Sequence, residues 1–356
     1  MSTGPHDFAA RLIRWQREHG RHDLPWQNTR DPYRIWLSEI MLQQTQVETV
    51  IPYYHRFLAR FPDLAALAAA RLDDVLALWS GLGYYARARN LHRAANIIVD
   101  AHGGRFPRQA GEIAQLPGIG RSTAAAIAAF AFDERGAILD GNVKRVLTRA
   151  YGVAGFPGQK AVENRLWELA ESLLPPAHEI AVYTQAQMDL GATLCTRARP
   201  ACTRCPFATE CVAHREGRTA QLPTPRPRKA IPTRQARFIV LRSGSQVLLE
   251  PRPLTGIWGG LLALPESPPS AADDLAPWLQ RQYGVAVEQQ QPLPPERHAF
   301  SHYRLEMDVV LCEVAARAPA TARETDALRA VSLAALDEAG LPAPVRRILD
   351  RLPPRS

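Results

Sequence analysis

A proline-rich stretch separates two regions of different sequence texture, and this division limits how the chain can fold. Residues 221–232 contain four prolines and three basic residues, and such a composition sustains neither a helix nor a strand. Residues 8–214 consist of runs rich in Ala, Leu, Arg and Glu with short Gly or Pro breaks, a pattern typical of helices. We therefore predict an all-α domain over residues 1–220, a linker over 221–233 and a second domain over 234–356.

The second domain has the texture of a mixed α+β fold. Residues 236–241 and 246–250 are predicted strands on either side of the turn Ser243-Gly244-Ser245. The other predicted elements are strands over 285–287 and 305–314, helices over 273–283 and 342–351, and loops over 265–272 and 315–322.

Composition and charge exclude some classes of protein. The chain has 356 residues, 46% of them hydrophobic, which suits two globular domains. The longest apolar run, residues 124–132, is far shorter than the roughly 18–20 residues of a membrane helix, and the N-terminus lacks the pattern of a secretion signal. We therefore expect a cytoplasmic protein without a membrane partner. The net charge of +8, from 43 Lys and Arg against 35 Asp and Glu, favours polyanionic partners only mildly.

Four of the five cysteines are clustered. Cys195, Cys202, Cys205 and Cys211 fall within seventeen positions, and Cys312 stands apart in a predicted strand, where we expect a buried core thiol. In a reducing compartment such a cluster indicates metal binding rather than disulfides. For an arbitrary set of four cysteines, zinc is the leading interpretation.

A glycine-rich turn joins two predicted helices within residues 108–132. The string Leu116-Pro117-Gly118-Ile119-Gly120 precedes a helix that begins at residue 121. Gly118 and Gly120 permit positive φ and close backbone approach, and the helix N-terminus offers free N–H groups to a phosphate oxygen. The alternative is an ordinary tight corner between two helices.

Two acidic residues have neighbours that suit catalysis. Asp140 directly precedes a predicted helix over residues 142–151. Glu39 lies in a predicted helix with an apolar stripe, and Gln43 and Gln46 share its face at i+4 and i+7. The alternatives are that Asp140 is only a helix N-cap and that Glu39 is a solvated glutamate.

These strings together resemble the MutY-type adenine DNA glycosylases of the helix-hairpin-helix superfamily, and the resemblance covers essentially the whole chain. Besides the hairpin, the matching strings are Leu-Pro-Trp at 24–26, Ser-Glu-Ile-Met-Leu-Gln-Gln-Thr-Gln-Val at 38–47, Gly-Leu-Gly-Tyr-Tyr-Ala-Arg-Ala-Arg-Asn-Leu at 81–91 and Leu-Asp-Gly-Asn-Val-Lys-Arg at 139–145.

The resemblance implies separate tasks for the two acids. Glu39 would protonate adenine at N7, and Asp140 would stabilise the sugar cation left when the N-glycosidic bond breaks, with Asn142 orienting Asp140 or the water. Adenine leaves poorly as an anion, so a protonated acid and an ionised carboxylate are both required. We expect burial to raise the pKa of Glu39, and helix N–H groups near Asn142 to keep Asp140 charged.

The resemblance also implies residues that contact DNA. The target base lies inside a duplex and must be flipped out. We expect Gln43 to fill the vacated stack and Tyr84 to act as an aromatic wedge, although core packing is an alternative for Tyr84. Contacts to the DNA backbone are expected from Leu116, Gly118, Gly120, Ser122 and Lys144.

One position separates this chain from a sister family. Enzymes of the endonuclease III type cut the DNA backbone through a lysine imine, and their lysine follows the Gly-Arg of the hairpin. That position here is Ser122, which has no amine to form a Schiff base. The sequence therefore favours a monofunctional glycosylase with water as the final nucleophile, although Lys144 could trap the abasic sugar adventitiously.

The resemblance also bears on the cysteines and on the second domain. The 6-2-5 spacing of the cysteines matches the [4Fe-4S] loop of the superfamily, over residues 195–211. Residues 252–266 resemble the start of a Nudix-type domain, but the acidic cluster that binds magnesium in Nudix hydrolases is missing, so we do not expect pyrophosphate hydrolysis. In the family this domain recognises 8-oxoguanine, and Phe300, Ser301 and His302 resemble its recognition loop.

We therefore predict a monomeric adenine DNA glycosylase of base excision repair, associated with the nucleoid when it is on DNA. Its substrate would be double-stranded DNA with adenine opposite 8-oxoguanine or, less well, opposite guanine. The rivals are an endonuclease III-like glycosylase with lyase activity, a lesion-binding protein without catalysis and a nucleotide hydrolase. The presence of both Glu39 and Asp140 argues against the non-catalytic rival.

Overall fold

The structure is a computed structural model, and it describes residues 5–227, 231–268, 275–300, 302–315 and 327–353. By its contacts the chain divides into two compact units. One comprises Met1–Ala68 and Arg93–Arg228, and the other comprises Ala69–His92 and Lys229–Ser356. Within the described residues, no helix has both the length and the apolar character needed to cross a membrane.

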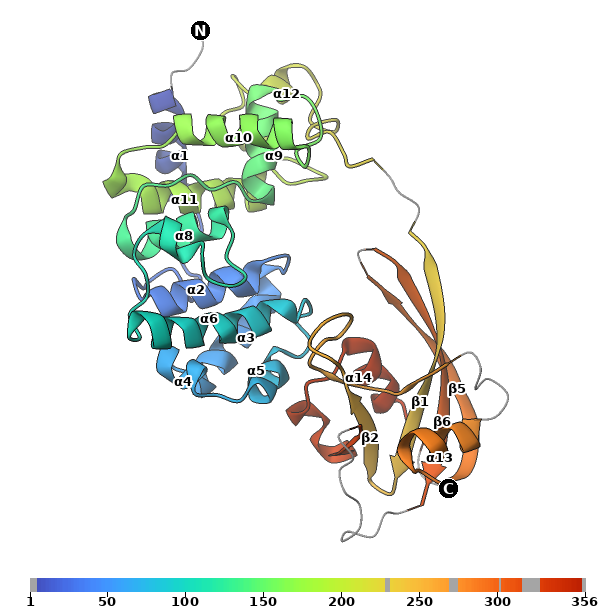
Figure 1. Ribbon diagram of the computed structural model, residues 1–356. Helices are drawn as coiled ribbons and strands as arrows, with labels where there is room; N and C mark the ends of the chain where they lie inside the picture. Colours follow the sequence, from blue (N-terminus) through green and yellow to red (C-terminus); the bar gives the residue numbers. More distant parts are fainter. Residues whose placement is uncertain (1–4, 228–230, 269–274, 301, 316–326, 354–356) are drawn as a thin grey trace. The chain divides into compact units, whose positions relative to one another are not determined.

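The first unit is all-α, as predicted, and no strand occurs among its described residues (Figure 1). Its helices are α1 (Pro5–His19), α2 (Pro32–Leu42), α3 (Val47–Arg60), α4 (Leu64–Ala68), α7 (Ala110–Ile113), α8 (Arg121–Phe132), α9 (Gly141–Tyr151), α10 (Lys160–Ser172), α11 (Ile180–Asp189) and α12 (Val212–Arg215). A π-helical turn, Leu190–Leu194, follows α11.

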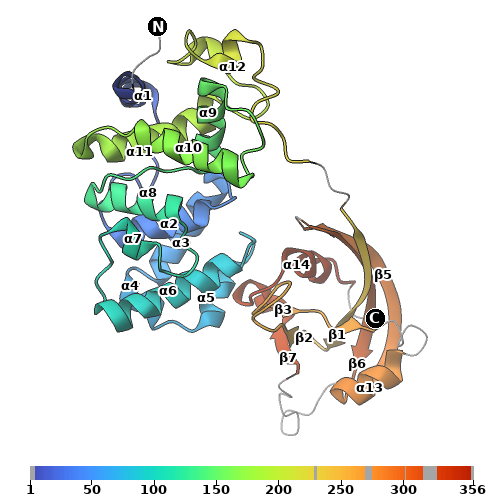
Figure 2. The ribbon, with the colours of Figure 1, turned by 45° about the horizontal axis from the view of Figure 1, so that its top comes forward.

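Helix α2 is fixed at its start and along one face. Asp31 caps it by accepting a hydrogen bond from the backbone N–H of Tyr33 at 2.9 Å, and Pro32 takes the first turn, where its missing N–H is not needed. The helix packs beside α8 (Figures 1 and 2). Helix α8 is rich in buried alanines, and such small side chains let two helices approach closely.

Helix α9 has a defined start and end. The carboxylate of Asp140 accepts a hydrogen bond from the backbone N–H of Val143 at 2.8 Å, which confirms the predicted N-cap. The helix ends at Gly152, whose φ of 65° is the left-handed conformation that glycine adopts without strain. Asp140 is therefore held at a fixed backbone position by the helix that it caps.

The second unit contains a seven-stranded sheet in the order β3-β2-β1-β6-β5, with β4 paired to β1 and β7 paired to β2 (Figure 2). Strands β1 and β6 run parallel, and the other pairs are antiparallel. The strands are β1 (Thr233–Ser243), β2 (Gln246–Pro251), β3 (Leu262–Ala263), β4 (Glu266–Ser267), β5 (Val287–Ala299), β6 (Arg304–Val314) and β7 (Arg329–Ser332). The helices are α5 (Leu72–Trp79), α13 (Leu275–Tyr283) and α14 (Ala343–Asp350), and α6 (Ala86–His102) runs through residues of both units.

The α+β prediction is confirmed, but two of its details are wrong. Residues 285–287 were the predicted strand, whereas β5 runs over Val287–Ala299 and includes three prolines. It tolerates them because it is an edge strand that pairs only with β6 and has irregular register between Leu293 and Glu296. Strand β4 lies inside the predicted loop 265–272. Residues 269–272 and 316–322 of the predicted loops lie outside the described residues.

Candidate active site

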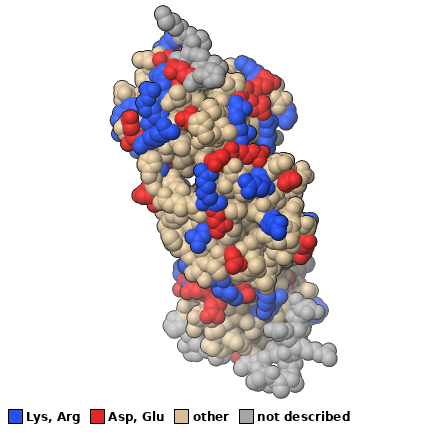
Figure 3. Space-filling model, turned by 90° about the vertical axis from the view of Figure 1, so that its left-hand side faces the viewer, with Lys and Arg blue, Asp and Glu red and all other residues tan. Residues whose placement is uncertain are grey.

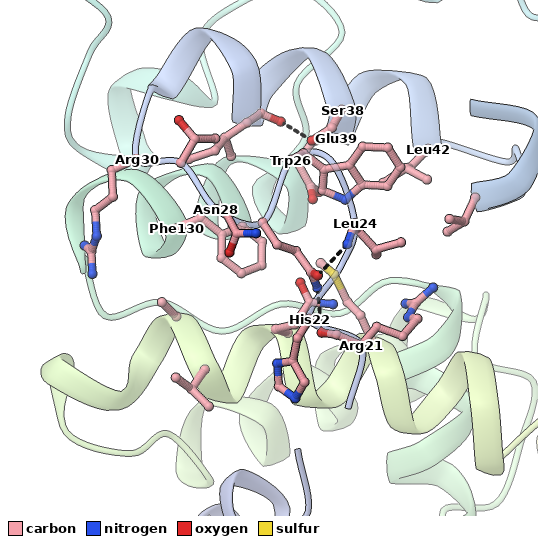
Figure 4. Close-up of a pocket in the computed structure, with 18 of the residues that line it drawn as sticks. Arg21, His22, Leu24, Trp26, Asn28, Arg30, Ser38, Glu39, Leu42 and Phe130 are labelled. Carbon is pink, nitrogen blue, oxygen red and sulfur yellow. Dashed lines mark hydrogen bonds between the residues drawn. The ribbon is translucent and has the colours of Figure 1, made fainter. Parts of the chain in front are cut away.

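Helix α2 presents Glu39 to a cavity of about 470 Å³ (Figure 4). The cavity walls come from the loop before α2 and from α2, α8 and α11, and they include Leu24, Trp26, Ser38, Leu42, Phe130 and Gln185. This volume lies within the range of about 300–1,000 Å³ that is usual for small-ligand pockets. Glu39 therefore lies in the wall of a cavity rather than on a freely solvated helix face, and its catalytic role stays a prediction.

The surroundings of Glu39 favour its protonated form. Burial in the cavity raises the pKa of Glu39 to about 8, and the negative charge of Asp140 contributes in the same direction. The predicted rise is confirmed. A carboxyl group with this pKa keeps its proton at neutral pH and is able to donate it to a bound group.

Asp140 has a partner for each carboxylate oxygen. Besides the bond from Val143 to Oδ1, the amide of Asn142 donates to Oδ2 at 3.4 Å. We expected these donors to keep Asp140 readily ionised, but burial outweighs them and raises its pKa, although the backbone N–H groups and Arg145 act to lower it. Since the charge of Asp140 also acts on Glu39, the two carboxyl groups are electrostatically coupled.

The hairpin lies next to the end of α2. Gln43, the C-cap residue of α2, donates a weak hydrogen bond of 3.5 Å from its amide to the carbonyl of Gly118. Gly118 has the predicted positive φ, at 79°. Gly120 has an ordinary φ of −90°. A Cβ atom added at Gly120 would meet nothing within 4 Å, so the backbone there is open to another molecule.

Three other predicted DNA-contact residues have partners inside the protein. The Leu116 side chain is buried, so any contact it makes with DNA would come from its backbone. The hydroxyl of Ser122 accepts a hydrogen bond from the backbone N–H of Leu139 at 2.9 Å, which ties α8 to the segment before Asp140. Lys144 forms an ion pair of 2.7 Å with Glu163.

The other predicted DNA-contact residues belong to the second unit. Tyr84 is 53% exposed, so the core-packing alternative for it is wrong. Phe300 stacks on Tyr303 with ring centroids 4.7 Å apart, and His302 is exposed. Ser301 lies outside the described residues.

Sequence reasoning missed several residues that build the cavity. Arg21, His22 and Asn28 line it from an irregular segment, and Gln185 lines it from α11. The string Leu-Pro-Trp at 24–26 was the available signal for the loop, but no periodicity marks which of its residues face a cavity. Gln185 is 146 positions from Glu39, so only the fold brings the two together.

Two arginines of α9 bind the start of the loop that contains the four clustered cysteines. Arg149 donates hydrogen bonds to the carbonyls of Thr196 at 2.7 Å and Arg197 at 3.0 Å, and one of 3.5 Å to the sulfur of Cys195. Arg145 donates to the carbonyl of Cys195 at 2.7 Å and to the side-chain oxygen of Asn142 at 2.8 Å. The cysteine loop is thereby linked to the residues beside Asp140.

The cysteines themselves form no disulfide, and the predicted burial of Cys312 is confirmed. The thiol of Cys205 is coupled electrostatically to the other three clustered thiols. Yet among the described residues no three His, Cys, Asp or Glu side chains come close enough to hold one metal ion. Four cysteines in one loop are a donor set that suits a bound metal or an iron-sulfur cluster.

Surface charge marks no DNA-binding face in the view of Figure 3. There, Lys and Arg side chains are interspersed with Asp and Glu side chains. This agrees with the modest net charge of +8.

Comparison with known proteins supports the resemblance to DNA glycosylases. Residues 37–172 match the family described as HhH-GPD superfamily base excision DNA repair protein, and residues 236–351 match the NUDIX domain. The thermostable thymine-DNA glycosylase of known structure has a TM-score of 0.53 and 29% sequence identity with this chain, over 59% of this chain and 96% of that one.

Two curated relatives share one name. The adenine DNA glycosylase of Buchnera aphidicola subsp. Acyrthosiphon pisum (strain APS) is 37% identical over 96% of this chain and 97% of its own length. The adenine DNA glycosylase of Mus musculus is 45% identical over 60% of this chain and 43% of its own length. The likeness to the Buchnera protein spans nearly the full length of both chains, and this chain therefore belongs to the adenine DNA glycosylase family of DNA repair enzymes.

Proposed function

We propose that this chain removes adenine that is mispaired with 8-oxoguanine, or less efficiently with guanine, from double-stranded DNA. The observation that carries the proposal is the pair of coupled carboxyl groups, with Glu39 in a cavity and the pKa of Glu39 raised to about 8. A flipped adenine in that cavity would meet Glu39 as a proton donor. The charge of Asp140 acts on Glu39 and helps to keep it protonated.

The coupling determines which acid carries the proton. The negative charge of Asp140 contributes to the raised pKa of Glu39, so ionised Asp140 and protonated Glu39 favour each other. Glu39 donates its proton to N7 of adenine, which turns a poor leaving group into a neutral one. The negative charge of Asp140 stabilises the positive charge that develops on the sugar as the N-glycosidic bond breaks. Water then completes the hydrolysis.

DNA would be held by the hairpin and opened by two side chains. The free N–H groups at the start of α8 and the open backbone at Gly120 suit a phosphate oxygen. Gln43, beside the hairpin, is placed to occupy the space left by the flipped base. Tyr84 is proposed as the aromatic wedge, since its ring is exposed.

The clustered cysteines would hold a [4Fe-4S] cluster, with Cys195, Cys202, Cys205 and Cys211 each binding one iron. N-glycosidic hydrolysis needs no electron transfer, so we assign the cluster to folding and to DNA engagement. Arg145 and Arg149 would keep the loop in place around the cluster.

Recognition of 8-oxoguanine is assigned to the second unit. Phe300 belongs to a group of rings with Trp258, His298 and Tyr303, with centroid separations from Phe300 of 5.9, 4.5 and 4.7 Å. Such a group presents rigid aromatic surface for contact with a base. We propose that Phe300, Ser301 and His302 contact the 8-oxoguanine opposite the adenine.

The test is a panel of duplexes that carry adenine opposite 8-oxoguanine, guanine or thymine. The wild-type protein, as a monomer, should release free adenine from the first two and leave a site that breaks only on alkaline treatment. Glu39→Gln should bind the same duplexes and release no adenine. Strand cleavage without alkali would contradict the monofunctional assignment to Ser122, and adenine release by Glu39→Gln would contradict the role of Glu39.

A further inference from the structure

Asp189, the last residue of α11, is a carboxylate that holds two cavity residues. Its side chain is 0% exposed. Its Oδ2 accepts a hydrogen bond from the backbone N–H of Arg21 at 3.0 Å, and its Oδ1 accepts one from Arg21 Nε at 2.8 Å and one from Gln185 Nε2 at 2.9 Å. Arg21 and Gln185 line the cavity that contains Glu39, whereas Asp189 does not. Asp189 therefore acts on this cavity only through its neighbours.

The bond from Gln185 fixes the orientation of its side-chain amide. An ionised carboxylate only accepts hydrogen bonds, so the amide nitrogen, and not the amide oxygen, must face Asp189. The carbonyl oxygen Oε1 is the other end of the same planar group, and among the described residues no donor is paired with it. Gln185 is thus held with a free hydrogen-bond acceptor, on a side chain that lines the cavity.

A fixed acceptor distinguishes between purines. Adenine carries an amino group at C6, which donates hydrogen bonds, whereas guanine and hypoxanthine carry an oxygen there, which accepts them. A carbonyl held toward that position favours adenine and repels the 6-oxo purines. If the side-chain amide of Gln185 could rotate by 180°, its N–H group would donate to the C6 oxygen of guanine or hypoxanthine, and the discrimination would be lost.

The bond to Arg21 affects the charge in the cavity. An unpaired guanidinium in this cavity would stabilise ionised Glu39 and so lower its pKa. Arg21 is instead paired with Asp189 at 2.8 Å, and the causes of the raised pKa of Glu39 are burial and the charge of Asp140. Loss of the charge on Asp189 would leave Arg21 unpaired and so favour ionised Glu39.

Asp189 also anchors the irregular wall of the cavity. The carbonyl of Arg21, whose N–H is bound to Asp189, accepts a hydrogen bond from the side chain of Gln27 at 2.9 Å (Figure 4). The same Gln27 side chain accepts one from the backbone N–H of Leu24 at 3.1 Å. This chain of bonds fixes the segment that begins at Arg21 without any regular secondary structure.

We propose that Asp189 is a positioning residue for base specificity: it holds the Gln185 carbonyl toward the amino group of adenine and neutralises Arg21 in the cavity of Glu39. This inference rests on the proposed function. It assigns no contact with the substrate to Asp189 itself.

The experiment compares wild-type protein with Asp189→Asn in single-turnover reactions on duplexes with adenine or hypoxanthine opposite 8-oxoguanine. Asparagine has the same shape but both donates and accepts, so Gln185 is free to turn over. The ratio of the adenine rate to the hypoxanthine rate should fall by about tenfold or more, the factor that corresponds to one hydrogen bond of the site. Because Arg21 then lacks its counter-charge, the pH above which the rate falls should also move to lower values. A purely structural role would slow both bases equally and leave that pH unchanged.

The matched control is Glu179→Gln, which breaks the ion pair of 3.5 Å between Glu179 and Arg17. That pair also links the N-terminal region to the segment of α11, but neither residue lines the cavity. This variant should keep the wild-type base ratio and pH dependence.

If Asp189→Asn does not fold, as judged by circular dichroism and thermal melting, Gln185→Leu provides the test. It should lose base discrimination while the pH dependence stays as in wild type, because Asp189 still pairs with Arg21. An unchanged base ratio in either folded variant would overturn the inference while leaving the proposed function intact. A wild-type protein that releases no adenine would instead refute the proposed function.

Discussion

At the scale of single residues, the candidate site is defined by what burial does to two acids. The roles of Glu39 and Asp140 were predictable because the sequence around each of them resembles a family with known chemistry. The raised pKa of Glu39 follows from its burial in a cavity. The rise in the pKa of Asp140 was not predictable. Local sequence shows that Asp140 caps a helix, but it does not show how deeply the cap is buried. Asp189 was equally hidden, because its partners at 21 and 185 are brought to it only by the fold.

The raised pKa of Glu39 should make the active protein less stable than an inactive variant. The folded pKa of about 8 lies above the ordinary value of 4.5, so folding stabilises the protonated form, and stability is lost as the pH rises through this interval. Glutamine has no proton to lose. We expect Glu39→Gln to raise the free energy of unfolding by about 1–3 kcal/mol at neutral pH. Urea denaturation should show this gain near pH 7.5 and little of it near pH 4.5, and an equal gain at both values would contradict this explanation.

At the scale of elements, the helices were predictable and the irregular connections were not. The hairpin, α8 and the capped helix α9 occur where the sequence places them, because glycine and cap residues mark their ends. Strand β5 escaped prediction because its three prolines argue against a strand, and only its edge position in the finished sheet makes them acceptable. Both hairpin glycines permit positive φ, but of the two only Gly118 adopts it, and the sequence does not show which of them does.

The two hairpin glycines should respond differently to the same substitution. Gly118 has a φ of 79°, so Gly118→Ala should cost about 1–2 kcal/mol of stability through backbone strain and also weaken DNA binding. Gly120 has an ordinary φ and open space around it, so Gly120→Ala should keep its stability but place a methyl group where a phosphate would approach. Chemical denaturation and fluorescence anisotropy with a labelled duplex measure the two effects. Wild-type affinity in Gly120→Ala would argue against the hairpin as a phosphate site.

At the scale of the whole molecule, the chain combines a catalytic unit with a unit that carries the proposed 8-oxoguanine contacts. The two-part organisation was predictable from one proline-rich stretch and from the change in texture across it. The grouping of residues 69–92 with the C-terminal residues was not predictable. These residues have the same helical texture as the first part of the chain.

Separate tasks for the two units predict separable effects of mutation. Phe300→Ala should lower the preference for adenine opposite 8-oxoguanine over adenine opposite guanine by about fivefold, since one aromatic contact contributes on the order of 1 kcal/mol. Release of adenine opposite guanine should change little. Phe300→Leu, which keeps an apolar side chain among the neighbouring rings, is the control for folding. Equal losses on both mispairs would show that Phe300 serves general DNA binding or stability.

Glu39 is proposed to be a proton donor whose pKa is raised by burial and by Asp140, and this role determines how adenine release depends on pH. The second-order rate constant of the wild-type protein should be steady near neutral pH and fall about tenfold per pH unit above a pH of about 8, as Glu39 loses its proton. Glu39→Gln should be inactive at every pH although it binds the duplex. A wild-type rate that stays constant to a pH of about 9.5, or adenine release by Glu39→Gln with the same pH dependence, would contradict the account.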